Sequence, residues 1–140
     1  MRVVLDTNVL ISGMINTDGT PAQIVNLLMN GRITILYDSR ILKEYEEVLN
    51  RKKFGFNKNV LTPILDHIRN EGEYVTAEPT DAKFVDDDDK MFYEVARTAK
   101  AKCVVTGNKD HFPNEELVTN PKEFIAWYLS EHKGQGAEAT

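Results

Sequence analysis

The sequence predicts an α/β fold built on a mostly parallel sheet, because short β-branched segments alternate with helical patterns along the whole chain. Its 140 residues suit one domain, and no internal repeat or linker divides them. Strands in such a fold are joined by right-handed crossovers, and functional side chains gather where the strands end. The residues that follow each strand are therefore the first candidates for a site.

The composition is that of an ordinary globular chain and excludes several classes of protein. With 41% hydrophobic and 28% charged residues, the chain is not intrinsically disordered. The net charge of −5 excludes a protein that is basic all over, but it is compatible with a local basic rim around an acidic centre. The single cysteine, Cys103, excludes a disulfide framework and a cysteine-rich zinc site. Because the chain shows neither a membrane-length apolar stretch nor a secretory leader, we expect a cytoplasmic protein.

The beginning of the chain predicts a strand and two helical segments. Residues 2–5 form an apolar run typical of a short buried strand. The apolar stretch 9–15 opens a helix that Gly13 is expected to break. Thr20, which a proline follows, is expected to cap the next helix, and Gly31 is expected to end it.

The middle of the chain continues the alternation. Residues 33–37 are β-branched and aromatic, which predicts a strand. Apolar residues at helical spacing predict a helix over 39–50, with its first serine as the cap. A further helix over 60–72 contains Pro63, which predicts either a kink or a later helix start at Thr62.

The second half of the chain predicts three short strands and two helices. These are the strands 74–76, 103–106 and 117–118, a helix directly after Asp89, and a helix that begins at Asn120-Pro121. The domain is expected to span residues 1–133, and the small residues of 134–140 are expected to form a flexible tail.

Acidic and polar residues stand where the predicted strands end. Asp6 follows the first strand, and Asp89 begins a helix whose first turn faces the same edge of the sheet. Thr106, Asn108 and Asp110 follow the late valine-rich strand. The topology therefore predicts that these side chains converge at one edge.

A helix in the middle of the chain adds one more acid to this edge. At 100° per residue, Glu44 and Glu46 fall on the two flanks of its apolar stripe, and spacing alone does not choose between them. Carboxylates that converge in one cleft repel each other unless a cation lies among them, and all-oxygen ligands suit Mg²⁺ or Mn²⁺. Such a cation can activate water toward a phosphate, so the residues predict a metal-dependent phosphodiesterase or phosphatase.

Each of these residues also has a simpler interpretation. Asp6 can be a turn or helix cap, and Glu44 can be a solvated helix acid. The run 86–90 can be a solvated loop in which Asp89 caps a helix. His111 lies in a polar loop, and we expect it at the surface or behind the site, without a partner.

Several segments together resemble the PIN-domain family, in particular its bacterial branch of toxins from toxin–antitoxin pairs. The resemblance covers nearly the whole chain in the right order. Its segments are 3–13 (VVLDTNVLISG), 39–49 (SRILKEYEEVL), 86–96 (DDDDKMFYEVA), 104–112 (VVTGNKDHF) and 119–125 (TNPKEFI).

The resemblance implies a single-domain, Rossmann-like PIN fold with a mostly parallel central sheet flanked by helices. It implies a Mg²⁺- or Mn²⁺-dependent endoribonuclease, a homodimer, and a cognate antitoxin as partner. It also selects Glu44 over Glu46. The residues to which it assigns catalytic and metal-binding roles are Asp6, Glu44, Asp89 and Asp110.

The resemblance further implies supporting residues around these acids. Thr7, Asn8 and Thr106 would order the carboxylates or a metal-bound water. Asn108 departs from the family, because many relatives have aspartate there and an amide binds a cation less strongly. Asp110 is the residue that could compensate. Within the acidic run, Asp86 or Asp88 could assist Asp89.

One concentrated basic segment could bind RNA. It contains Arg51, Lys52, Lys53 and Lys58, which we expect to contact phosphates. Phe54 and Phe56 lie between them and could stack on bases. The alternative is a solvated turn whose two phenylalanines fold into the core.

Three other functions compete with the ribonuclease. An aspartyl-phosphate phosphatase needs a second acid two residues after Asp6, where this chain has Asn8. A phosphorelay receiver needs an acidic pair before its phosphoacceptor and a late lysine, and neither spacing is evident. The strongest alternative is a catalytically weak or inactive PIN-like module that binds RNA or a protein partner, which Asn108 and the negative net charge favour.

Overall fold

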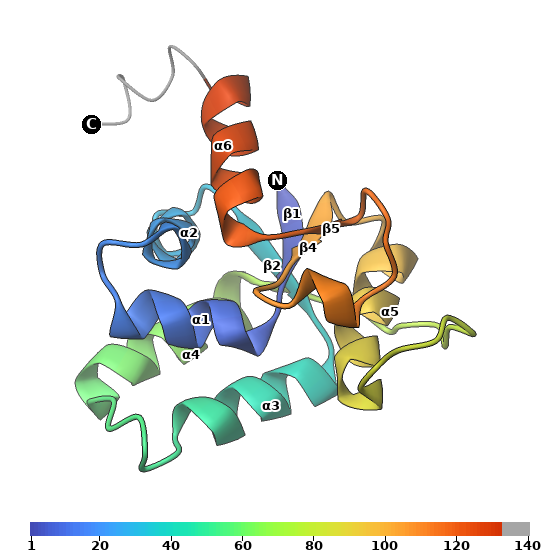
Figure 1. Cartoon of the computed structure of the whole chain (residues 1–140). Coiled ribbons are helices and arrows are strands. Elements are labelled where there is room, and N and C mark those ends of the chain that lie inside the picture. Colours follow the sequence, from blue (N-terminus) through green and yellow to red (C-terminus); the bar gives the residue numbers. More distant parts are fainter. Residues whose placement is uncertain (133–140) are drawn as a thin grey trace.

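The computed structural model describes residues 1–132. Its core is a five-stranded parallel sheet with the strand order β3-β2-β1-β4-β5 (Figure 1). The strands are β1 (Arg2–Leu5), β2 (Thr34–Tyr37), β3 (Glu73–Tyr74), β4 (Cys103–Val105) and β5 (Val118–Thr119). The α/β class and the parallel sheet expected from the sequence are confirmed. The expected tail, 134–140, lies outside the described residues.

Helices cover the sheet and connect its strands. They are α1 (Thr7–Ile15), α2 (Thr20–Met29), α3 (Ser39–Leu49), α4 (Lys58–Glu71), α5 (Lys90–Ala99) and α6 (Pro121–Glu131), with the short 3₁₀ turns η1 (Asp87–Asp89) and η2 (Lys109–His111). Figure 1 shows α1 and α2 on one side of the strands and α5 on the other, where α5 packs on β1, β2 and β4. None of the helices within residues 1–132 is long and apolar enough to cross a membrane.

The central strands are apolar throughout because helices cover both of their faces. Val3, Val4 and Leu5 of β1 are fully buried, and so are Val104 and Val105 of β4. Burying such side chains contributes about 1.5–3 kcal/mol each. The two strands that precede Asp6 and Thr106 are therefore anchored in the core.

Gly13 does not break the first helix, contrary to expectation. It is buried inside α1, and a Cβ atom there would lie 2.7 Å from Val25 Cγ2 and 2.8 Å from the carbonyl oxygen of Pro21. Those atoms belong to α2, so the missing side chain is what allows the two helices to pack closely. The glycine is a packing requirement and not a helix stop.

Three helix starts also differ from expectation. The cap of α2 is Gly19, and Thr20 is its first helical residue. The cap of α3 is Asp38, whose Oδ1 accepts the Ile41 N–H at 3.0 Å, and Ser39 is the first helical residue. α4 begins at Lys58, after the Asn57 side chain accepts the Asn59 N–H at 2.8 Å. The start at Thr62 is therefore wrong, and Pro63 lies inside the helix.

Candidate functional site

Asp6 lies at the centre of the carboxyl edge, directly after β1. It is only 6% exposed, and its backbone N–H donates to the Val105 carbonyl of the neighbouring strand at 2.9 Å. Its Oδ2 accepts a hydrogen bond from the Thr106 hydroxyl at 2.8 Å and one from the Asn8 amide at 3.3 Å. Burial raises the pKa of Asp6, while the Thr106 hydroxyl, the backbone N–H groups of Asn8 and Thr7, and nearby His111 act in the opposite direction.

Glu44 reaches the same region from α3. It is half-buried and accepts a hydrogen bond from the hydroxyl of Thr7, the residue after Asp6. Burial and the charge of Asp6 raise the pKa of Glu44, against the hydrogen bond from Thr7. Glu46 turns instead toward α4, where it pairs with Arg69 at 2.8 Å. The structure thus distinguishes Glu44 from Glu46, a choice that helical spacing alone did not make.

Asp89 completes the cluster from the start of α5. Its side chain is 19% exposed and makes no capping hydrogen bond to that helix. Burial, followed by the charges of Asp6 and Asp86, raises the pKa of Asp89 to about 6, and Glu44 adds to this effect. Three carboxylates from three separate parts of the chain therefore lie close enough for the charge of Asp6 to raise the pKa values of Glu44 and Asp89, and we call Asp6, Glu44 and Asp89 the acid cluster.

The acidic run before α5 contributes in two ways. Asp86 raises the pKa of Asp89, and Asp88 raises that of Glu44. The Asp86 side chain also accepts the Asp88 N–H at 2.9 Å, which shapes the η1 turn. Both residues named as assistants of Asp89 thus act on the acid cluster through their charge.

His111 lies next to the acid cluster, so the expectation that it lacks a partner is wrong. Its Nδ1 is 3.8 Å from Asp89 Oδ2, and it acts to lower the pKa of both Asp89 and Asp6. The turn η2 brings it there from beyond β4. Only its place shortly after a strand end hinted at this position in the sequence.

Asp110 and Asn108 lie in the same loop, but both are more exposed than the three acids of the cluster. Asp110 is exposed and faces a hollow that Asn108, His111 and Glu123 also line. Asn108 is exposed as well, and its backbone N–H donates to the Thr106 hydroxyl at 3.0 Å. The structure brings these two residues near the edge but does not bury them with the three acids.

The supporting residues tie the loops of this edge together. The Thr106 side chain is fully buried between Asp6 and the Asn108 N–H. Asn8 donates to Asp6 and accepts the Gly107 N–H at 3.1 Å through its Oδ1. These hydrogen bonds link the end of β1 to the loop after β4 and hold the Asp6 carboxylate in place.

The basic segment lies beside the acid cluster. Arg51 follows α3 closely enough to lower the pKa of Glu44, and Lys52, Lys53 and Lys58 are exposed. The rings of Phe54 and Phe56 stack at 5.6 Å with an interplanar angle of 12°. Phe56 also packs against the core, as the simpler alternative expected for it.

A PIN-domain family model matches residues 2–110, a span that contains the acid cluster and Asp110. The chain belongs to the PIN-domain family. PIN domains are generally nucleases and typically use divalent metals such as Mg²⁺. An uncharacterized protein from Methanocaldococcus jannaschii is 33% identical to the chain over 140 residues, covering 89% of this chain and 90% of that protein. No solved structure matches the chain significantly.

The donor set of this PIN domain suits such a metal. The acid cluster offers only carboxylate oxygens, which hard divalent cations prefer. Its members repel one another, and a cation among them would relieve that repulsion. Within residues 1–132, no three His, Cys, Asp or Glu side chains are already arranged to hold a metal ion. The residues fit the metal by their chemistry, and the side chains would have to close around it.

Proposed function

We propose that this PIN domain is a Mg²⁺- or Mn²⁺-dependent endoribonuclease that hydrolyses phosphodiester bonds in RNA. The observation that supports it is the acid cluster: Asp6, Glu44 and Asp89 come from three parts of the chain and share one edge, burial raises the pKa of each, and the charge of Asp6 raises the pKa values of the other two further. Partly buried carboxylates that repel one another cost stability, and such perturbed groups cluster at functional sites.

The residues of the acid cluster would hold the metal, and Asp110 is the fourth acid that could reach it from η2. A bound Mg²⁺ or Mn²⁺ supplies an activated water and neutralises charge that develops on the phosphate. The protein's own part is orientation. Thr106 and Asn8 fix the Asp6 carboxylate, and Thr7 fixes that of Glu44.

Single-stranded RNA would approach over the basic segment. Arg51, Lys52, Lys53 and Lys58 gather positive charge in a chain whose net charge is −5. The charge of Arg51 acts on Glu44, which supports an approach of RNA from the side of Arg51. Phosphate contacts there would align the strand across the acids, and the half-buried Phe54 could stack on a base.

We also propose a toxin-like role for the nuclease in the cytoplasm, as a homodimer controlled by an antitoxin protein. The support is the resemblance of the segments around Asp6, Glu44 and Asp89 to bacterial PIN toxins. Induced expression in a bacterial host should arrest growth, and the Asp6→Asn variant should not. Equal growth of the two strains would contradict the toxin role.

A second candidate is a PIN-like module that binds RNA or a protein partner without cutting RNA. The observation that favours it is the loop after β4, where Asn108 stands in place of an acid and Asp110 is exposed. RNA binding that is equal with and without metal, together with no cleavage of any substrate, would support this candidate.

Cleavage of a single-stranded RNA decides between the two candidates. The wild-type protein should cut RNA in Mn²⁺ or Mg²⁺ and should stop in EDTA, while Asp6→Asn should be inactive under all conditions. Cleavage that persists in EDTA or in Asp6→Asn would contradict the proposed nuclease site.

A further inference from the structure

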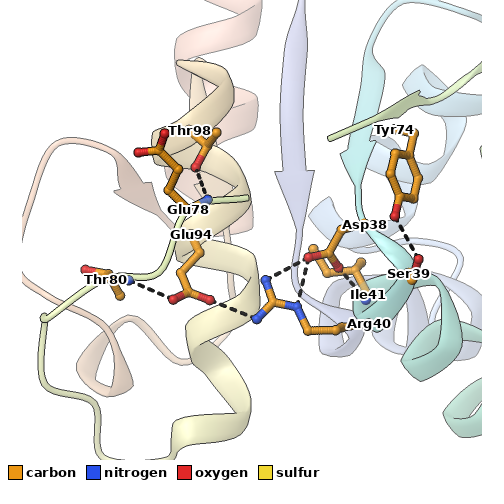
Figure 2. Close-up of polar contacts among 9 residues, drawn as sticks. All are labelled: Asp38, Ser39, Arg40, Ile41, Tyr74, Glu78, Thr80, Glu94 and Thr98. Atoms are coloured by element: carbon orange, nitrogen blue, oxygen red, sulfur yellow. Dashed lines mark hydrogen bonds and ion pairs between the residues drawn. The ribbon is translucent and has the colours of Figure 1, made fainter. Parts of the chain in front are cut away.

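Two further acids, Asp38 and Glu94, share one arginine (Figure 2). Asp38 and Glu94 are buried, with 6% and 7% of their surface exposed. Arg40 reaches both of them. Its Nη2 is 2.7 Å from Asp38 Oδ2, and its Nη1 is 2.9 Å from Glu94 Oε1. Here the chain supplies its own cation between two carboxylates, and we call this contact the arginine bridge.

The arginine bridge joins the two helices that carry acids of the cluster. Arg40 precedes Glu44 on α3 by four residues, and Glu94 of α5 follows Asp89, the residue just before that helix, by five. At 3.6 residues per turn, these separations are about 1.1 and about 1.4 helical turns. Within the described residues, no other ion pair connects α3 with α5.

Glu94 also fastens the segment that leads to Asp89. Its second oxygen, Oε2, accepts the Thr80 N–H at 2.8 Å. One turn further along α5, the Thr98 hydroxyl accepts the Glu78 N–H at 2.9 Å (Figure 2). Both oxygens of Glu94 are therefore used, and the bridge fixes α3, α5 and this segment to one another.

We propose that Arg40 is a positioning residue that sets the separation of Glu44 and Asp89, and through it the affinity of the site for a divalent cation. This inference rests on the proposed function. The charges of Glu44 and Asp89 oppose the approach of α3 and α5, and the attraction between Arg40 and Glu94 offsets that repulsion one turn away. Arg40 itself does not contact the metal or the RNA in this account.

The chain contains a matched control for this arginine. Arg69 also bridges two acids, Glu46 of α3 at 2.8 Å and Asp66 of α4 at 2.9 Å. The exposed fractions of the two arginine side chains are similar, 49% for Arg40 and 39% for Arg69. Arg69, however, joins α3 to α4, and α4 carries no acid of the cluster.

The test is the dissociation constant of Mn²⁺, measured by calorimetry at a temperature where every variant is folded. Arg40→Met should weaken Mn²⁺ binding about tenfold, the lower end of what removing a ligand-orienting partner costs. Arg40→Lys should fall between this variant and wild type, because an ammonium cannot bridge both acids in a fork. Arg69→Met should bind Mn²⁺ within about twofold of wild type, because surface ion pairs contribute little.

Two results would overturn the inference alone: Arg40→Met binding Mn²⁺ as wild type does, or Arg69→Met being weakened as much. In both cases wild type still binds the metal and Asp6→Asn does not. If wild type fails to bind Mn²⁺, or Asp6→Asn binds it equally, the proposed function and the inference both fall.

A second variant keeps the test decisive if Arg40→Met does not fold. Glu94→Gln retains the size of the side chain and an oxygen for the Thr80 N–H, but it removes the charge that attracts Arg40. It should weaken Mn²⁺ binding about threefold, a fraction of the cost of removing an orienting partner outright. Unchanged Mn²⁺ binding in this variant would overturn the inference.

Discussion

The carboxyl edge of the sheet holds two groups of acids that solve the same electrostatic problem differently. In the arginine bridge, the buried carboxylates of Asp38 and Glu94 share Arg40. In the acid cluster, Asp6, Glu44 and Asp89 form no ion pair with Lys or Arg among residues 1–132, and only His111 approaches Asp89.

The difference indicates which group is structural and which is left for a ligand. In the arginine bridge, Arg40 balances the two carboxylates and thereby favours one arrangement of α3 and α5. In the acid cluster, the charge of Asp6 raises the pKa values of Glu44 and Asp89, and an external cation would relieve this repulsion. Substitutions in each group of acids test these two roles separately.

The largest effect is expected from the acid cluster itself. Replacing Asp6, Glu44 or Asp89 by its amide should lower the Mn²⁺-dependent rate of RNA cleavage at least about a hundredfold, because losing a ligand exceeds the loss of a ligand-orienting partner. Glu46→Gln is the matched control, since Glu46 lies two residues from Glu44 and faces Arg69. A Glu46 variant as inactive as the Glu44 variant would contradict the assignment.

The arginine bridge should contribute more to the free energy of unfolding than the ion pairs of Arg69 do. Arg40→Met leaves two buried carboxylates without their cation and should lower the free energy of unfolding by about 2 kcal/mol, less than for a fully buried pair because Arg40 is half-exposed. Arg69→Met should cost about 0.5 kcal/mol. Urea denaturation in EDTA measures both. Equal losses would show that the bridge is only a surface contact.

A smaller effect is expected from pH in the metal-free protein. The pKa of Asp89 is raised to about 6, so between pH 6 and 4 the folded state binds more protons than the unfolded state. Its contribution to stability should therefore grow by about 1 kcal/mol as the pH falls from 7 to 5. Urea denaturation in EDTA should show this gain in wild type, and Asp89→Asn should lack it. A gain of the same size in both proteins would assign it to other groups.

The smallest effect is expected from the basic segment. Changing Lys52 and Lys53 to alanine should flatten the slope of log affinity for single-stranded RNA against log salt by about 1.4, or about 0.7 for each phosphate that is no longer neutralised. Filter binding at several salt concentrations measures the slope. As a control, Lys122 is an exposed lysine of α6, and its alanine variant should keep the wild-type slope. A slope unchanged in the double variant would remove this segment from the RNA path.

Local patterns in the sequence predicted most of the fold and part of the site. The apolar strands, the alternation with helices, and the position of Asp6 after β1 all follow from short-range signals. Gly13 was misjudged because its role depends on α2, whose approach is a tertiary contact that helix propensity does not contain. Helical spacing left Glu44 and Glu46 equivalent, and only the positions of Thr7 and Arg69 separate them.

The partners that come from distant segments could not be predicted. His111 reaches Asp89 through the η2 turn, and Arg40 meets Glu94 across two helices. Neither pair has a fixed spacing in the sequence. The residues that directly follow strands were identifiable, because the topology places them at one edge, whereas the residues that orient or balance them depend on packing.

The most direct test of the central claim is the position of Mn²⁺ in crystals of the wild-type protein, located by its anomalous scattering. One peak is expected among the carboxylates of Asp6, Glu44 and Asp89, and no peak is expected in crystals of Asp6→Asn. A Mn²⁺ peak elsewhere, or no peak at a Mn²⁺ concentration that supports RNA cleavage, would contradict the claim that these acids form the metal-dependent site.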